Sequence, residues 1–175
     1  LKKIPGFGGL QLKAPPGIEP ALLEKAAKSI PGNKGLGDFL TRFYTLHNGL
    51  DFNWQISTAD QTYGGALHIP SLEKMLGGFS SIVLEYKANC FSDFFTNTTD
   101  QKNNPVSADL HLFDQGHYEN YTIGINLLDG NKMYCSLNSD IFLLETDPEK
   151  YFAKCLESYG ISFWQFALIH SDERA

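Results

Sequence analysis

The feature that most constrains the fold is a change of hydrophobic periodicity at Asn48-Gly49. Before this pair, apolar residues recur at three- and four-residue steps over 36–47, which is typical of an amphipathic helix. After it, apolar and polar residues alternate over 50–56, which is typical of a half-buried strand. Asn and Gly readily adopt a left-handed backbone, so the pair predicts the end of the helix. The chain is therefore expected to turn directly from a helix into a strand.

A histidine stands at this boundary, and His47 beside Asn48 and Asp51 raises the question of a catalytic role. An active site requires a nucleophile or an acid–base partner for the histidine, and no such pattern accompanies it. A histidine in the last turn of a helix complements the carbonyl groups that end there. We therefore interpret His47 as part of the helix end, and we predict no catalytic residue.

The first half of the chain is predicted to hold a lead-in, helices and short strands. Residues 1–17 are rich in Gly and Pro, which indicates extended backbone, and "LQL" at 10–12 is a possible edge strand. A helix is expected over 18–32, because prolines stand in its first turn and at its end. Further along, 67–69 is expected to form a short strand, and a short helix is expected over 71–76.

The second half of the chain is predicted to be mainly sheet. Four short apolar segments bounded by turns indicate strands, and Asp129-Gly130-Asn131 is a hairpin signal between two of them. The connections contain no helical crossover, so we expect antiparallel pairing. A helix follows over 146–160, where Thr146 and Glu149 form a capping box, and a last helix begins at Ser162. The strands are expected at 110–113, 121–128, 132–137 and 141–145.

Together these elements indicate a single α+β domain with a central antiparallel sheet and helices packed at one face. The domain is expected over 18–170, followed by a polar tail at 171–175. The segment 80–95 fits either a helix or a strand, and the polar segment 96–107 is predicted to be an exposed loop. A chain of 175 residues with 42% hydrophobic content can bury a core of its own.

Net charge and cysteine content narrow the classes of function. The formal charge is −6, which excludes nonspecific nucleic-acid binding because that requires a cationic surface. Two interpretations of the acidity remain: it suits a basic protein partner, or it only keeps the protein in solution. The three cysteines, Cys90, Cys135 and Cys155, are widely spaced without a CxxC pair, which argues against a disulfide framework or a structural zinc site. This cysteine usage fits a reducing, cytoplasmic setting, and no apolar run is long enough to predict a span across a membrane.

One stretch, "DLHLFDQGHYEN" at 109–120, contains residue types that bind metal ions. Histidine and carboxylate side chains suit zinc, iron or manganese. The stretch lacks HExxH or another established spacing, so a polar strand edge and turn explain it better. A metal-dependent enzyme is kept as a second alternative, and we otherwise expect neither a metal nor a cofactor. Its candidate ligands are Asp109, His111, Asp114 and His117.

The order of these parts resembles the SUKH superfamily, which includes fungal cell-wall (glucan) synthesis regulators and many bacterial toxin-immunity proteins. The resemblance is carried by "DFLTRFYTLHNGLDF", "GALHIPSLEKM", "LHLFDQG", "YTIGINLLDG", "KMYCSL" and "ETDPEKYFAKCLESYG". It implies the family's α+β fold and a non-enzymatic binding role without shared catalytic residues. Many bacterial members neutralise a toxin by direct contact, and a regulatory scaffold related to the cell-wall regulators is the alternative.

A binding role directs attention to aromatic residues in polar settings, because tyrosine and tryptophan concentrate binding energy at interfaces. Acidic neighbours would complement a basic partner. Trp54 alternates with Phe52, so a place in the core is the competing interpretation for it. The candidate contacts are Trp54, Tyr63, Tyr118 and Tyr121, with Asp51, Asp114 and Glu119 as acidic neighbours.

Overall fold

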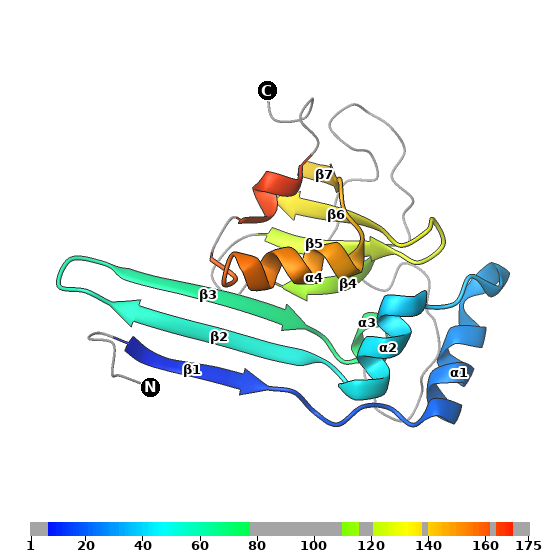
Figure 1. The fold of residues 1–175 in the computed structure, drawn as a ribbon. Coiled ribbons are helices and arrows are strands. Elements are labelled where there is room, and N and C mark those ends of the chain that lie inside the picture. The colour runs from blue at the N-terminus through cyan, green and yellow to red at the C-terminus, as the bar shows by residue number, and fades with distance from the viewer. Residues whose placement is uncertain (1–6, 78–109, 116–120, 138–139, 162–163, 170–175) are drawn as a thin grey trace.

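The computed structural model describes residues 7–77, 110–115, 121–137, 140–161 and 164–169 (Figure 1). Helices and strands both occur where the periodicity predicts them. The elements are β1 (Phe7–Lys13), α1 (Pro20–Ser29), a 3₁₀ helix (Pro31–Asn33), α2 (Asp38–Leu46), β2 (Leu50–Ser57), β3 (Thr62–Ile69), α3 (Leu72–Met75), β4 (His111–Gln115), β5 (Tyr121–Asn126), β6 (Lys132–Leu137), β7 (Asp140–Leu144), α4 (Pro148–Glu157) and a second 3₁₀ helix (Trp164–Leu168). None of these helices is long and apolar enough to cross a membrane.

The described strands form two antiparallel sheets, in the orders β1-β2-β3 and β4-β5-β6-β7. This confirms the α+β class and corrects the expectation of one central sheet. Two backbone N–H groups of β3 donate to acceptors other than the backbone of β4. The Asp114 carboxylate accepts the His68 N–H at 2.9 Å, and the Gly160 carbonyl accepts the Ala66 N–H at 2.9 Å. The first sheet therefore ends at β3.

The predicted boundary between helix and strand is confirmed. Helix α2 ends at Leu46, and His47 is already extended while its N–H donates to the Phe43 carbonyl at 2.8 Å. Gly49 has a φ of +102°, and a Cβ there would lie 3.0 Å from the Ile69 carbonyl oxygen. Glycine is therefore required both by the backbone angle and by the close approach of β3.

The main core lies where the helices meet the inner faces of both sheets. From α1 come Leu23 and Ala26, and from α2 come Leu40 and Tyr44. The Tyr44 hydroxyl donates to the Pro70 carbonyl at 3.0 Å, and burial, with a smaller effect of the Glu73 charge, raises the tyrosine's pKa. A second, smaller cluster covers the other side of the second sheet with Leu110, Leu112, Tyr134 and Ile141.

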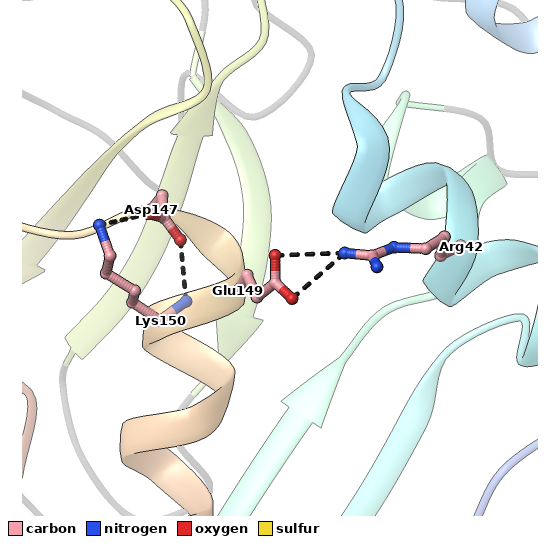
Figure 2. Close-up of polar contacts among 4 residues, drawn as sticks. All are labelled: Arg42, Asp147, Glu149 and Lys150. Atoms are coloured by element: carbon pink, nitrogen blue, oxygen red, sulfur yellow. Dashed lines mark hydrogen bonds and ion pairs between the residues drawn. The ribbon is translucent and has the colours of Figure 1, made fainter.

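Local turn and cap chemistry agrees with the sequence in one place and differs in two. The hairpin between β5 and β6 is confirmed, and Gly130 and Asn131 both have positive φ there. The predicted capping box is wrong, because the N-cap of α4 is Asp147, whose carboxylate accepts the Lys150 N–H at 2.8 Å (Figure 2). The last helix is a 3₁₀ helix over Trp164–Leu168.

Candidate binding groove

An apolar groove of about 580 Å³ lies between α2 and α4. Its floor is the first sheet, and its walls come from the two helices. It is lined by Leu12, Leu50, Phe52 and Leu67 from the sheet, Phe39, Arg42, Phe43, Leu46 and His47 from α2 and the residue after it, and Glu149, Phe152 and Leu156 from α4.

The floor of the groove follows from strand register. Leu12 of β1 lies opposite Phe52 of β2, which in turn lies opposite Leu67 of β3. Residues that face each other in a ladder project from the same side of the sheet, so all three side chains belong to the floor. Leu67 is 1% exposed and Leu12 is 61% exposed. The apolar floor therefore runs from the core out to solvent at the edge strand.

An aromatic cluster forms one part of the walls. The Phe152 ring of α4 lies 5.9 Å from the Phe39 ring and 6.1 Å from the Phe43 ring of α2, measured between centroids. Beside it, Figure 2 shows the Arg42 guanidinium reaching from α2 to the Glu149 carboxylate on the first turn of α4. One Arg42 nitrogen lies 3.2 Å from each carboxylate oxygen. Both side chains are about two-thirds exposed, at 65% and 63%, so this pair stabilises the fold only weakly.

The rim of the groove carries large apolar side chains that face solvent. Leu12 and Leu46, which line the groove, are 61% and 67% exposed, and Leu10, on the same face of β1 as Leu12, is 58% exposed. On the α4 side, Leu156 is 51% exposed and Tyr159, just after the helix, is 68% exposed. A single exposed leucine requires no explanation, whereas several beside one apolar groove form a larger apolar surface, a feature that is uncommon on monomeric proteins.

A tightly built corner presents Tyr159. Its backbone is left-handed, with a φ of +55°, and its carbonyl oxygen accepts the indole N–H of Trp54 at 2.5 Å. A Cβ on Gly65 would collide with that carbonyl and with the Trp54 ring nitrogen, so this position of β3 requires a glycine. The corner thus attaches the end of α4 to the face of the first sheet.

Three predicted contact residues lie on the first sheet but do not form one group. Trp54 is half-buried and tied to Tyr159, whereas Tyr63 is 52% exposed near the free end of the hairpin β2–β3. Asp51 lies opposite His68 in the ladder and hence on the other face of the sheet, where its Oδ1 is 3.5 Å from His68 Nδ1. Trp54 and Tyr63 therefore share the apolar face, and Asp51 does not.

Two predicted contacts are corrected by the structure, because Asp114 and Tyr121 are 1% and 7% exposed. Asp114 accepts the Tyr151 hydroxyl at 2.7 Å, and the Tyr121 hydroxyl accepts the Gln165 amide N–H at 2.8 Å. Asp114 and Tyr121 therefore each bond to a partner inside the molecule and are not at the surface. Tyr118 and Glu119 lie outside the described residues.

The proposed metal ligands are described only in part, since Asp109 and His117 lie outside the described residues. Buried His111 donates from Nδ1 to the Met75 carbonyl at 2.9 Å. The Asp114 carboxylate accepts hydrogen bonds from the His68 backbone N–H and the Tyr151 hydroxyl. Within the described segments, no three His, Cys, Asp or Glu side chains gather as a metal site would require.

The two described cysteines are buried and not disulfide-bonded. Burial, followed by the charge of Asp114, raises the pKa of both Cys135 and Cys155 to about 12. A thiol with such a pKa is protonated near neutral pH and is a poor nucleophile. Both residues act as small core side chains, while Cys90 lies outside the described residues.

The fold and the groove define an α+β protein with an apolar surface fit for contact with another molecule. Neither a protein-family model, nor a curated protein, nor a solved structure matches the chain.

Sequence reasoning missed the groove because leucines such as Leu12 and Leu46 were assigned to the core or to a lead-in. The edge strand expected at 10–12 is confirmed by β1, but the sequence pattern does not show that its leucines lie beside α2.

Proposed function

We propose that the protein is a non-enzymatic binding module that acts by direct contact with another protein, in the manner of SUKH-type immunity proteins. The observation that carries the proposal is the apolar groove between α2 and α4 with its rim of exposed leucines. Complete burial of one leucine side chain is worth about 1.5–3 kcal/mol. Leu10, Leu12 and Leu46 are 58%, 61% and 67% exposed, so a partner that covers them gains about 1–2 kcal/mol from each.

The charge of the chain supports a basic partner. A formal charge of −6 raises the rate at which a cationic protein meets this one and repels acidic proteins. A basic toxin, such as a nuclease, has the required chemistry. A regulatory scaffold would use the same surface, and the two roles differ in what the partner does when it is bound.

Affinity capture from the source organism tests the proposal. The tagged wild-type chain should retain a basic protein in stoichiometric amounts, and Leu46→Ser should lose it because the groove rim is interrupted. Leu22→Ser is the matched control, since Leu22 is 47% exposed on α1 and does not line the groove. Capture of the same proteins at the same level by all three chains would contradict a role for the groove.

The activity of the captured protein decides between the two roles. A toxin should inhibit growth when it is expressed alone, and co-expression of the wild-type chain, but not of Leu46→Ser, should restore growth. A captured protein that is harmless on its own supports the regulatory scaffold. Stoichiometric zinc or iron in the purified protein, together with turnover of a substrate, would contradict a non-enzymatic role.

A further inference from the structure

The outer edge of the first sheet offers a place for another strand. Strand β1 pairs with β2 on one side only, and within the described residues no strand pairs with its other side. In Figure 1, β1 runs along the border of the sheet that faces away from β4. An edge of this kind presents a row of backbone donors and acceptors, which favours the addition of an extended chain.

Features that usually prevent a further strand from pairing with an edge strand lie at both ends of β1 and leave its centre accessible. The register shifts between Phe7 and Gly9, which marks a bulge on one side. On the other side stand the prolines Pro15 and Pro16, which discourage strand pairing because proline has no backbone N–H. Between these devices lies a window at residues 10–13, where Leu10 and Leu12 are exposed on one face of the sheet.

The window is continuous with the groove. Leu12 belongs to both, and Leu46 of α2 lines the groove together with it. A strand placed beside β1 would set every second side chain on the face that carries Leu10 and Leu12. Its apolar side chains would cover these leucines and extend the floor of the groove by one strand.

We infer that the window at residues 10–13 receives an extended segment of a cationic protein partner as an additional strand of the first sheet. The segment alternates apolar side chains, which lie on Leu10 and Leu12, with polar or basic ones on the opposite face. This inference rests on the proposed function and adds to it the mode of recognition, in which backbone hydrogen bonds provide much of the affinity.

Charge and size favour a cationic partner over a second copy of this chain. Two copies would bring together formal charges of −6 each, which repel, whereas a basic protein is attracted. A stable dimer also requires roughly 800 Å² of buried surface on each partner. Self-pairing through a four-residue window supplies only a small part of that area, while a partner can use the window and the groove together.

A peptide of ten alternating valine and lysine residues serves as the probe, since it has the inferred pattern and charge. Its binding to the whole chain is measured by calorimetry, and hydrogen–deuterium exchange locates the contact. We expect slower exchange of backbone amides at residues 10–13. Leu12→Ser should weaken binding by about tenfold, whereas Leu22→Ser should bind as the wild type does. A valine–glutamate peptide should bind more weakly because of its charge.

A second peptide separates strand addition from simple hydrophobic contact. Methylation of every second amide nitrogen removes donors that an added strand needs but keeps the side chains, and it should weaken binding by about tenfold. Equal binding of both peptides, or no binding of either, would overturn the inference. Protection confined to α2 and α4 would indicate a groove-bound helix instead.

Other occupants of the window give distinct results. A dimer in sedimentation that Leu12→Ser dissociates would identify a second copy as the occupant. Slow exchange, in the protein alone and in Leu12→Ser monomers, of those amides at residues 10–13 that point away from β2 would identify another part of this chain. Either result overturns the inference.

The natural complex distinguishes failure of the inference from failure of the proposed function. If no stoichiometric partner is captured, the proposed function fails. If a partner is captured but residues 10–13 exchange equally fast in the free and bound protein, the inference fails and the function stands.

Discussion

Asp114 and Tyr151 bond to each other in the interior, where the tyrosine hydroxyl donates to carboxylate Oδ2 at 2.7 Å. Asp114 belongs to β4 and Tyr151 to α4, and both are at most 1% exposed. The second carboxylate oxygen accepts the backbone N–H of His68 on β3 at 2.9 Å. A single acidic side chain thus connects the two sheets and the C-terminal helix, and it holds in place two of the three parts that border the groove.

Tyr151→Phe tests this connection with little change of packing. The variant keeps the ring against Phe113 and Trp164 but removes the donor to Asp114. Hydrogen bonds to charged groups contribute about 1.5–3 kcal/mol, and we expect the free energy of unfolding in urea to fall by that amount. Tyr63→Phe is the control, since Tyr63 is 52% exposed and its loss should change stability by less than about 0.5 kcal/mol. Equal effects of the two substitutions would show that the buried bond is not a principal support.

Stability should decrease at alkaline pH because of the buried thiols. Burial raises the pKa of Cys135 and Cys155 from 9.0 to about 12. A group with a raised pKa in the folded state contributes stability that is complete below its unfolded pKa and is lost as pH rises toward the folded pKa. The loss therefore begins near pH 9.0 and continues to about pH 12.

The pH dependence can be assigned by replacing both thiols. Between pH 9.0 and 10.0 the cysteines titrate in the unfolded chain before Tyr44 and Tyr151 do. The unfolding free energy of the wild type should fall over this interval, and that of Cys135→Ala/Cys155→Ala should fall less steeply. Thiol labelling of the native wild type at pH 8 should be slow for both residues. Equal slopes in the two chains, or fast labelling of Cys135 and Cys155, would contradict burial as the cause.

The corner at Tyr159 should tolerate no side chain at Gly65. The added methyl group of Gly65→Ala would collide with the Tyr159 carbonyl and the Trp54 indole, and overpacking of this kind costs about 1–3 kcal/mol. The backbone at Tyr159 should then lose its contact with the first sheet. Faster hydrogen–deuterium exchange of the backbone amides at residues 159–161, or stronger quenching of tyrosine fluorescence, would report this loss. Gly130→Ala is the comparison, because a Cβ at Gly130 meets nothing within 4 Å and only its φ of +63° opposes the change. Faster exchange at residues 159–161 in both variants would show that general destabilisation, and not the collision, releases the corner.

Elements determined by local chemistry were predictable from the sequence. The end of α2 just before Asn48-Gly49, the β5–β6 hairpin at Gly130-Asn131 and the span of β6 all follow from neighbouring residues. The cap of α4 was misassigned by one position because Thr146 and Asp147 are both good N-cap residues. The choice between them depends on the backbone angle at the chain's exit from β7, which the sequence pattern does not contain.

Features that depend on contacts between distant residues were not predictable. The division into two sheets depends on Asp114 and Gly160, which occupy β3 donors from 46 and more residues away in the chain. The burial of Asp114 likewise follows from its tertiary partners, although its sequence context suggests an exposed turn. The groove requires β1 to lie beside β2, which places Leu12 near Leu46 only after folding.

Two acidic residues at the start of α4 should differ sharply in their effects, because Asp147 caps the helix and Glu149 makes a surface ion pair (Figure 2). Partial burial raises the pKa of Asp147, but hydrogen bonds from the Lys150 backbone and ammonium group outweigh it and hold the pKa below 3.8. Its contribution to stability is therefore present above pH 3.8 and is lost as pH falls below that value.

Substitution of each residue separates the cap from the ion pair. Asp147→Ala should lower the unfolding free energy by about 1 kcal/mol at pH 7, since the Lys150 N–H loses its acceptor. Glu149→Gln should lower it by less than about 0.5 kcal/mol, because the pair with Arg42 is exposed to water and salt. Urea titrations at low and high salt provide the measurement. The Glu149 effect should vanish at high salt, whereas the Asp147 effect should lose only the part due to its exposed pair with the Lys150 ammonium and keep the part due to the cap. A larger loss from Glu149→Gln than from Asp147→Ala would mean that the bridge to α2, and not the cap, holds α4 over the sheet.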